Sequence, residues 1–446
     1  MHLDLTQGDI KNQIKTLAIP SSIGFFFHTI YNVTDTYFAG LISTQALSAL
    51  TLSFSIFFMV IAFASGMSEA VTALVGNALG SKDKEYASHI TLNSLVFALI
   101  LTLGVTLTGL ASASFLMQVL GANASYLQES LAYINIILYG SIFFVFSFFL
   151  NAILNSVGDT KSFRNILIFS SLVNVVLDYW FVLGGLGLEP QGIQGIAFAT
   201  VLTEFISCIY LFYKVQKTPL LLSEKPFHLD MKVFKELLYQ GIPPSANLVL
   251  MAGGIFIITY FAAQHGQDVI AAFGVGMRVE QIALMPSIGL NVAVLAIISQ
   301  NNGAKNYKRI HETLNAAMFY GGVLSFGGLV LLLVAAEPLM ELFTKDPQVI
   351  HEGVVYIRVE AFILYSFVII FVHIAMLQGI KKPGFIICIS IFRQIVAPFS
   401  LLAFFSYLGL GLIWVWLGVA GIVTFSALLT YIYSRKKLAE LELCVS

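Results

Sequence analysis

Two aspartates stand in long apolar stretches, where an ionisable side chain is uncommon. Asp35 lies in the segment YNVTDTYFAG, and Asp178 lies in NVVLDYWFVLG. A carboxyl group in apolar surroundings readily takes up a proton, because desolvation disfavours its charged form. It also suits Na⁺, since hard cations take oxygen ligands. The two aspartates are therefore candidates for binding a proton or a small cation.

Three further polar residues fall near these aspartates. Asn174 precedes Asp178 by four positions, which places both on one face of a helix. Thr200 lies in the next apolar stretch, and Glu204 follows it on the same face. We predict a cation-coupling site formed by Asp35, Asn174, Asp178 and Thr200, with Glu204 as a further candidate. Alternatively, each aspartate is a buried structural group satisfied by backbone and hydroxyl partners, and Glu204 faces a polar crevice.

The composition is that of a membrane protein. Of 446 residues, 58% are hydrophobic and only 11% are charged, whereas a soluble domain carries about 25% charged residues. The net charge of −1 gives no indication of a nucleic-acid partner. The three cysteines match no disulfide framework or metal motif, and there is no nucleotide-binding P-loop. We predict a non-enzymatic protein without a cofactor and with no metal ion other than a coupling Na⁺.

Twelve apolar runs are long enough to cross a bilayer, which requires roughly 20 residues of helix. Helices are expected because an open strand would leave backbone groups unpaired in lipid. The runs fall near residues 14–38, 46–75, 88–112, 130–154, 164–184, 194–213, 238–263, 270–298, 313–335, 355–378, 385–407 and 412–433. The sequence thus predicts an all-α membrane protein with twelve transmembrane helices.

Basic residues predict that both termini are cytoplasmic. Lysine and arginine collect in cytoplasmic loops. With the N-terminus inside, only Lys345 of the 23 basic residues falls in an outside loop. Three more lie within spans, namely Arg278, Arg358 and Arg393. In this topology Asp35, Asp178 and Thr200 lie at similar depths in the outer half of the membrane.

The chain matches itself at a shift of 223 residues. Ile19-Pro20-Ser21-Ser22 lies over Ile242-Pro243-Pro244-Ser245, Gly66 over Gly289, and Tyr133 over Tyr356. Each half has six spans, so the two bundles are parallel and related by a pseudo-twofold axis along the membrane normal. We predict an N-terminal lobe at 1–213, a cytoplasmic linker at 214–235 and a C-terminal lobe at 236–446. Alternating access by rocking of the lobes suits this design, although a duplicated scaffold with another role is the alternative.

The polar set does not recur in the second half. At the 223-residue shift its members correspond to apolar residues, namely Ile258, Ala397, Leu401 and Val423. A structural requirement of the fold should appear in both halves, so we assign ion coupling to the first. The other in-span acids, Glu280 and Glu360, are expected to form inter-helix pairs or to lie near the membrane interface.

Pro20 lies within the first predicted helix. Proline in a helix removes one backbone hydrogen bond and clashes with the preceding turn. The residue is either a tolerated kink or a hinge that bends the helix when Asp35 changes protonation. We keep the hinge as a hypothesis.

Several short motifs resemble those of the MATE (multidrug and toxic compound extrusion) family. They are D-T-x-x-A-G from Asp35, N-S-V-G-D-T-K from Asn155, N-x-x-L-D from Asn174 and G-I-x-G-I-A-x-A-T from Gly192. The resemblance to its DinF-like branch implies that Asp35, Asn174, Asp178 and Thr200 form the coupling site. Met251 stands close to the position where the NorM branch has an acidic residue, which argues against a NorM-type site in the second lobe.

The resemblance also implies a function. Members export amphipathic, often cationic, drugs and dyes in exchange for H⁺ or Na⁺. For this chain it implies a multidrug efflux antiporter of the bacterial inner membrane, with small molecules and membrane lipid as partners, and we expect a monomer. The alternative is a lipid-linked sugar flippase of the same superfamily, which would need basic residues for a phosphate.

Overall fold

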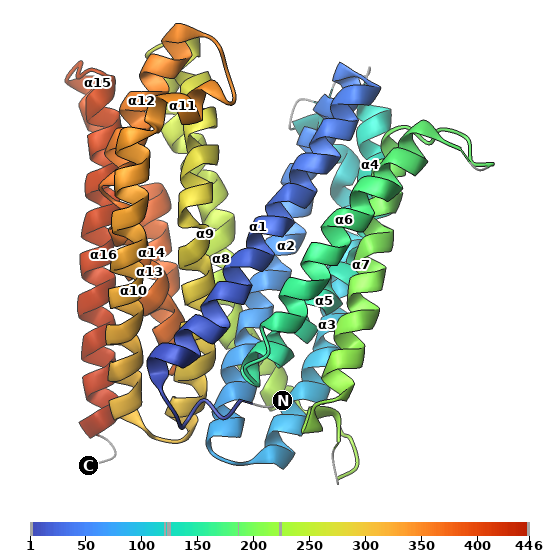
Figure 1. Cartoon of the computed structure of the whole chain (residues 1–446), viewed down its shortest axis with the longest axis vertical. Helices are drawn as coiled ribbons and strands as arrows, with labels where there is room; N and C mark the ends of the chain where they lie inside the picture. Colours follow the sequence, from blue (N-terminus) through green and yellow to red (C-terminus); the bar gives the residue numbers. More distant parts are fainter. Residues whose placement is uncertain (1–2, 120–121, 123–125, 186, 223–224, 444–446) are drawn as a thin grey trace. The chain divides into compact units, whose positions relative to one another are not determined.

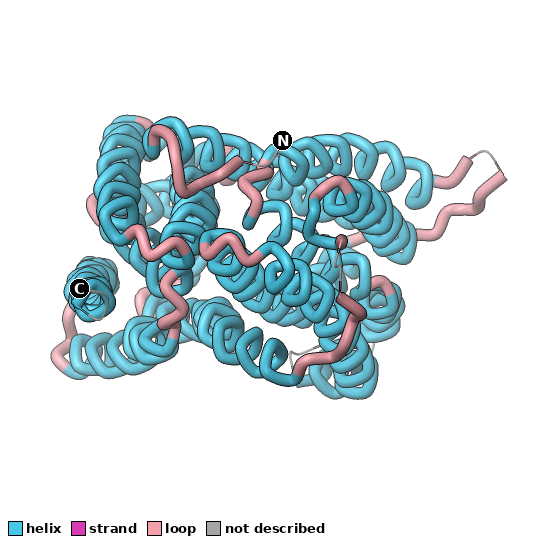
Figure 2. Tube along the Cα trace, turned by 90° about the horizontal axis from the view of Figure 1, so that it is seen from below, coloured by secondary structure: helices cyan, strands magenta, loops and turns pink. Residues whose placement is uncertain are grey.

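The structure, a computed structural model, describes residues 3–119, 122, 126–185, 187–222 and 225–443. Within these residues every regular element is helical (Figure 2). One isolated β-bridge joins Gly185 and Leu188. Helices satisfy every backbone group within their own segment, which the lipid interior requires. The predicted all-α fold is confirmed.

The first half of the chain forms seven helices (Figure 1). They are α1 (Ile10–Ile42), α2 (Thr44–Gly80), α3 (Lys84–Val119), α4 (Leu127–Tyr139), α5 (Ser141–Ser156), α6 (Lys161–Leu183) and α7 (Ile193–Gln216), followed by the 3₁₀ turn η1 (Pro219–Leu221).

The second half repeats this order with more interruptions. Its helices are α8 (Met231–Ala263), α9 (Gln267–Gly303), α10 (Tyr307–Val334), α11 (Ala336–Glu341), α12 (Pro347–Ala361), α13 (Leu364–Gly379), α14 (Gly384–Ile391), the π-helical turn η2 (Phe392–Val396), α15 (Ala397–Tyr407) and α16 (Leu412–Leu443).

All twelve predicted spans appear, and several helices extend beyond the expected bounds, by as much as ten residues at the end of α16 (443 against 433). Nine helices pass a test of length and hydropathy for crossing a membrane, and the bent pairs α4–α5 (45°) and α12–α13 (50°) bring the described candidates to eleven. The twelfth is α1, which is 33 residues long. Its composition explains why it does not pass the hydropathy test, because polar residues recur among the apolar ones between Ser21 and Asp35.

Local geometry also shows the duplication. The bent pairs break at Gly140 in the first half and at residues 362–363 in the second. Lys82, after α2, and Lys305, after α9, both take a left-handed conformation, with φ of 63° and 55°. Such a backbone is uncommon for a residue with a side chain. Its recurrence at the 223-residue shift shows that both halves turn between their second and third helices in the same way.

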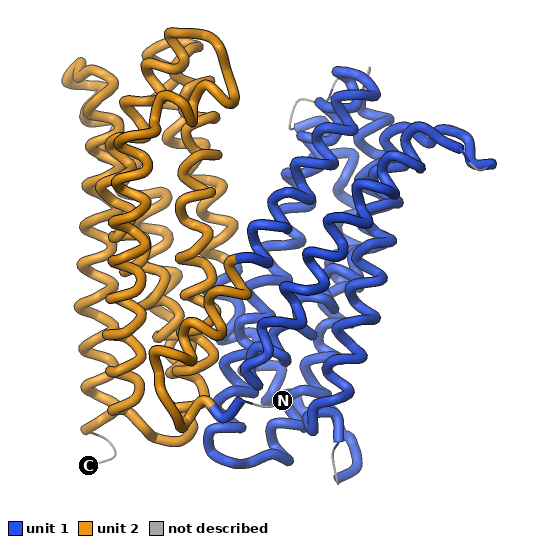
Figure 3. Tube along the Cα trace, in the orientation of Figure 1, with its two compact units in different colours: residues 1–4, 23–245 blue, residues 5–22, 246–446 orange. Residues whose placement is uncertain are grey.

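The chain divides into two compact units (Figure 3). Unit 1 contains residues 1–4 and 23–245, and unit 2 contains residues 5–22 and 246–446. These boundaries differ from the predicted lobes of 1–213 and 236–446, because the first helix of each half begins in one unit and ends in the other. A repeat reveals that a segment was duplicated but not which neighbours its first helix packs against.

Specific contacts hold the N-terminal segment in unit 2. The Leu5 N–H donates to Gln300 Oε1 at 2.9 Å. The Arg309 guanidinium donates to the carbonyls of Leu5, Gln7 and Gly8 at 3.3, 3.4 and 2.9 Å. These bonds satisfy backbone groups that precede α1 and fix where the helix starts.

Each unit has its own apolar core. In unit 1, buried residues of α2, α4 and α7, such as Phe57, Ile137 and Ile196, pack together beside the helix ends that carry Asp35 and Asp178. In unit 2, Phe273 stacks on Trp416 and Tyr356 meets both rings edge-on in a corresponding cluster. Many other large apolar side chains face outward, Phe256 and Phe326 among them, as expected where lipid replaces water.

Candidate functional site

The two predicted aspartates are buried inside unit 1. Asp35 of α1 is 5% exposed, and Asp178 of α6 is fully buried. They lie within hydrogen-bonding reach of each other. Two carboxyl groups at such a distance repel each other strongly when both are charged, so a shared proton or a bound cation would stabilise the pair.

Asn174 and Thr200 complete the group. The Thr200 hydroxyl donates to Asp35 Oδ2 at 3.1 Å. With its amide nitrogen turned toward the carboxyl groups, Asn174 donates to Asp35 Oδ1 and Asp178 Oδ2, each at 3.2 Å. Both side chains are almost fully buried, at 0% and 1% exposed. The structure therefore brings all four predicted residues into one contiguous site.

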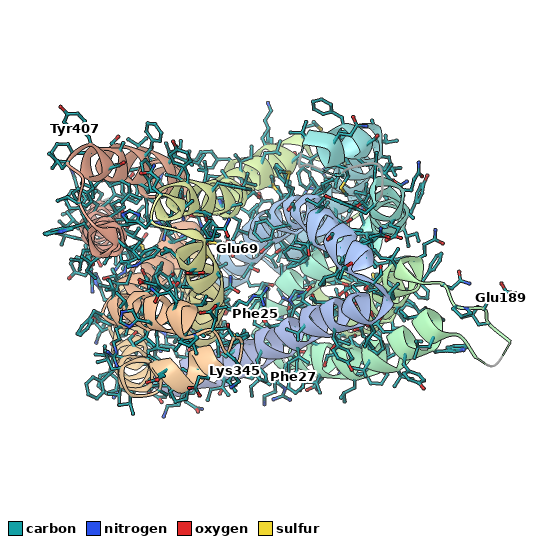
Figure 4. The ribbon with its side chains drawn as sticks, turned by 90° about the horizontal axis from the view of Figure 1, so that it is seen from above. Phe25, Phe27, Glu69, Glu189, Lys345 and Tyr407 are labelled. Carbon is teal, nitrogen blue, oxygen red and sulfur yellow. The ribbon has the colours of Figure 1, made fainter. Side chains whose placement is uncertain are left out.

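Three helices position these side chains. Asn174 and Asp178 occupy successive turns on one face of α6, and Thr200 lies in the second turn of α7. The loop between α6 and α7 reverses the chain, so the end of one helix lies level with the start of the other. Figure 4 shows this loop projecting away from the helices of unit 1, with Glu189 at its tip. The end of α6 and the start of α7 thus bring Asp178 and Thr200 to the same level of unit 1, while their depth in the membrane stays a prediction.

One oxygen of the site has no partner among the described residues. Asp178 Oδ1 is buried and accepts no hydrogen bond. A buried polar atom without a partner costs free energy, about 1–3 kcal/mol and more when charged. A proton on this oxygen, or a cation beside it, removes that cost. The arrangement is chemically suited to loading and releasing one small cation.

Two buried tyrosines border the site. Tyr31 lies one turn before Asp35 on α1, and its hydroxyl hydrogen-bonds with Thr203 Oγ1 at 2.8 Å. Tyr133 of α4 is 4% exposed and faces both aspartates. Tyr31 could have been found from its spacing of four residues before Asp35 on one helix. No sequence signal separates Tyr133 from ordinary core aromatics.

Glu204 is not part of the contact group. Its side chain is partly exposed and lies near Tyr31 and Ser147 instead. Because it is one turn beyond Thr200 on α7, it continues the polar face of that helix away from the aspartates. Its suggested participation in the site stays a prediction.

The equivalent positions in unit 2 carry no such chemistry. Ala397 and Leu401, which match Asn174 and Asp178 in the repeat, line a pocket of about 480 Å³ whose walls are almost wholly apolar. The pocket is completed by Phe392, Ser400, Phe404, Gly421, Ile422 and Phe425. The predicted asymmetry of these positions is confirmed.

Unit 2 nevertheless contains a carboxyl pair that the sequence argument missed. Glu280 of α9 accepts a hydrogen bond from the Tyr356 hydroxyl at 2.6 Å. Glu360 of α12 is 2% exposed, and its Oε1 has no partner among the described residues. In the described part of the chain neither forms an ion pair with a basic side chain, and the inter-helix partner of Glu280 is the Tyr356 hydroxyl. Buried acids are thus not confined to unit 1.

A tyrosine shared by the repeat accompanies both pairs. Tyr133 in unit 1 and Tyr356 in unit 2 are related by the 223-residue shift. Glu280 and Glu360 themselves replace Phe57 and Ile137, which belong to the apolar core of unit 1. Each unit therefore keeps the tyrosine and places acids on different sides of it, which comparison of equivalent positions could not reveal.

Pro20 lies inside α1, two residues before the point at which this helix passes from unit 2 to unit 1. Pro243 and Pro244 of α8 occupy the matching place, just before the chain passes from unit 1 to unit 2 after Ser245. This placement suits a hinge, although the hinge itself stays a prediction.

Together these features define a class of protein. Twelve membrane-length helices in two repeated sets, with acids buried in their interior, are the architecture of a secondary transporter. The MatE family model matches residues 20–180 and 243–403, two segments that start 223 residues apart. The chain therefore belongs to the MATE family of transporters and is not an enzyme.

Individual relatives agree with this assignment. The chain is 25% identical over 434 residues to the probable multidrug resistance protein NorM of Thermotoga maritima, covering 95% of this chain and 92% of the relative. It is 26% identical over 417 residues to an FAD transporter of Shewanella oneidensis, covering 91% and 90%. It also matches the outward-facing structure of a multidrug resistance MATE family transporter, with a TM-score of 0.91, 25% identity and 98% of each chain covered.

Proposed function

We propose that this protein exports amphipathic, often cationic, small molecules in exchange for H⁺ or Na⁺, and that Asp35 and Asp178 carry the coupling ion. The single observation that carries the proposal is the buried group in unit 1. Asn174 bridges the two carboxyl groups, Thr200 donates to Asp35 alone, and Asp178 Oδ1 accepts no hydrogen bond. Loading a cation there reduces the negative charge of the group by one, and release restores it.

The Asn174 amide bears on which ion is used. When its nitrogen faces the carboxyl groups it donates to both at 3.2 Å, which suits a pair holding one shared proton. With its oxygen turned toward the carboxyl groups, the same amide would offer a bound Na⁺ a further ligand, because hard cations take oxygen and not N–H groups. The direct reach between Asp35 and Asp178 also supports a shared proton. We therefore favour H⁺ and treat Na⁺ as the other outcome of the test.

The electrostatics of unit 1 favour a cationic substrate. Its described basic side chains are not among the buried residues, whereas two acids are. A lipid-linked sugar flippase would need buried positive charge to hold a phosphate, so this alternative has no support in unit 1. The relatives named for multidrug resistance are consistent with export of drugs.

We also propose a location, a topology and an oligomeric state for the protein. The distribution of lysine and arginine favours a cytoplasmic position for both termini, and the bacterial relatives favour the inner membrane. A monomer suffices, because each half already has its partner in the same chain. The polar set in α1, α6 and α7 favours the DinF-like branch of the family.

The test uses purified protein in liposomes that contain a fluorescent cationic dye. We expect dye movement when a pH gradient is imposed at constant Na⁺, and none when a Na⁺ gradient is imposed at constant pH. The Asp178→Asn variant, which retains the size of the side chain, is the control and should behave like empty liposomes. The proposal would be contradicted if the dye moved under neither gradient. It would also be contradicted if the protein moved a lipid-linked sugar but no dye.

A further inference from the structure

Two histidines and an aspartate meet at one end of unit 1, far from the buried aspartates of the proposed coupling site. They are His89 in the second turn of α3, His228 in the segment before α8, and Asp230, the residue before that helix begins. One ligand atom of each lies within 4.8 Å of the others. His89 and Asp230 are partly buried and His228 is exposed, so the cluster is open to ions from solution.

The fold holds this cluster through a buried asparagine. Asn93, fully buried one turn beyond His89 on α3, donates to the His228 carbonyl at 3.2 Å and accepts the Asp230 N–H at 2.9 Å. Asp230 Oδ1 accepts the Lys232 N–H at 2.8 Å and so caps the start of α8. Its other oxygen, Oδ2, is the one that faces His89 Nε2, at 3.4 Å.

The ligand types and spacing suit a divalent transition metal. Imidazole and carboxylate bind Zn²⁺, whose tetrahedral bonds of about 2.0–2.2 Å place ligand atoms about 3.3 Å apart. The observed separations, 3.4 Å for His89–Asp230 and up to 4.8 Å for the group, reach this geometry by small side-chain rotations. Three ligands leave a fourth position for water. A hard ion such as Mg²⁺ would prefer oxygen ligands alone.

The repeat supplies an internal comparison. His311, which aligns with His89 after a one-residue gap, binds Glu442 Oε1 at 2.6 Å. Its Nδ1 accepts a hydrogen bond from the Arg435 guanidinium at 3.0 Å. The histidine–acid pair is therefore a shared feature of both units and can serve to hold a neighbouring segment. In unit 1, however, the second residue beside the pair is a histidine, His228. In unit 2 it is Arg435, whose positive charge would repel a metal ion.

We propose that His89, His228 and Asp230 bind one Zn²⁺-class ion, which fastens residues 225–230 to α3. The ligands lie as much as 141 residues apart in sequence, so no short motif indicated the site, and the sequence analysis predicted no metal site. The proposal is independent of the transport function and of the coupling ion.

The test measures metal binding to the full chain, purified in detergent with an affinity tag that contains no histidine. Zn²⁺ is titrated by calorimetry, and Co²⁺ is used to record the visible absorption of a tetrahedral site. We expect one ion per chain. His228→Ala and Asp230→Asn should each weaken binding by at least about tenfold. Asparagine is also a good helix cap, so the second variant keeps the start of α8 intact.

The matched control is His351→Ala, which removes an exposed histidine of α12 far along the chain. It should bind Zn²⁺ with unchanged affinity and show the same Co²⁺ spectrum. The proposal is overturned if the unmodified chain binds no Zn²⁺, which would leave His89–Asp230 a structural pair only. It is equally overturned if His228→Ala and His351→Ala bind the ion alike.

Discussion

Thr200 Oγ1 on α7 donates a hydrogen bond to Asp35 Oδ2 on α1 at 3.1 Å, although the two residues are 165 positions apart in sequence. The bond joins a neutral hydroxyl to a carboxyl group whose charge would change on ion loading in the proposed mechanism. Hydrogen bonds to charged groups are worth about 1.5–3 kcal/mol. It therefore contributes most when Asp35 is ionised.

Thr200→Val keeps the shape of the side chain but removes the donor. The ionised form of Asp35 then loses its bond, and ion release should become harder. We expect dye efflux from proteoliposomes to fall by roughly 10- to 100-fold, the range that about 1.5–3 kcal/mol allows. Thr200→Ser, which retains the hydroxyl, is the control and should keep most of the activity. Equal activity of the valine and serine variants would show that the bond has no part in transport.

Asp178→Asn and Glu360→Gln test where coupling occurs. Both replace a buried acid that has an unpartnered oxygen by its neutral isostere. We expect Asp178→Asn to remove gradient-driven efflux, as Asp35→Asn should. Glu360→Gln should retain efflux and keep or raise the melting temperature, because it removes an unpaired buried acid. The measurements are dye efflux and thermal unfolding of each purified variant.

Comparison of the two variants shows which unit carries the coupling ion. If Glu360→Gln abolishes efflux as completely as Asp178→Asn, then the acids of unit 2 also carry the coupling ion. Normal expression of both variants is the required control, and it is checked by the elution profile of each protein in detergent.

Much of the fold followed from elementary rules. Length and hydropathy predicted the spans because each helix must cross the same bilayer thickness. Asn174, Asp178 and Thr200 could be placed together because two helices joined by a short loop share a level in the membrane. Asp35 joined them by the same depth argument.

What the sequence could not predict depended on packing between distant segments. Glu280 and Glu360 were expected to form inter-helix pairs or to lie near the membrane interface, but no pattern in the sequence identified Tyr356 as the residue that bonds to Glu280. The membership of residues 5–22 in unit 2 rests on contacts such as Leu5 with Gln300, 295 residues away in sequence. No periodicity or composition encodes such a pairing.

Pro20→Ala tests the proposed hinge. Alanine restores the backbone N–H that proline lacks, so the helix gains a hydrogen bond and loses its steric clash. We expect the melting temperature to hold or rise while efflux falls, because a stiffer α1 resists bending where it passes between the units. The control is Pro286→Ala in α9, which lies wholly within unit 2. Normal efflux by Pro20→Ala would remove the hinge from the mechanism.

Gly66→Ala tests a close approach that the repeat shares. A Cβ on Gly66 of α2 would lie 2.3 Å from the Ser245 backbone nitrogen, and one on Gly289 of α9 would lie 2.5 Å from the Ala18 carbonyl oxygen. Both contacts involve backbone atoms, which cannot rotate away. We therefore expect Gly66→Ala to destabilise the protein by about 1–3 kcal/mol, as overpacking does.

The matched control for this variant is Gly104→Ala in α3, where an added Cβ would meet nothing within 4 Å. Alanine there should be neutral or slightly stabilising, because it restricts the unfolded chain without strain. Thermal unfolding of both variants in the same detergent gives the comparison. A drop in melting temperature for Gly66→Ala alone would show that the repeated glycines allow the proline-bearing first helices to pack closely against their neighbours. Equal melting temperatures would mean that α8 can shift to accept the methyl group.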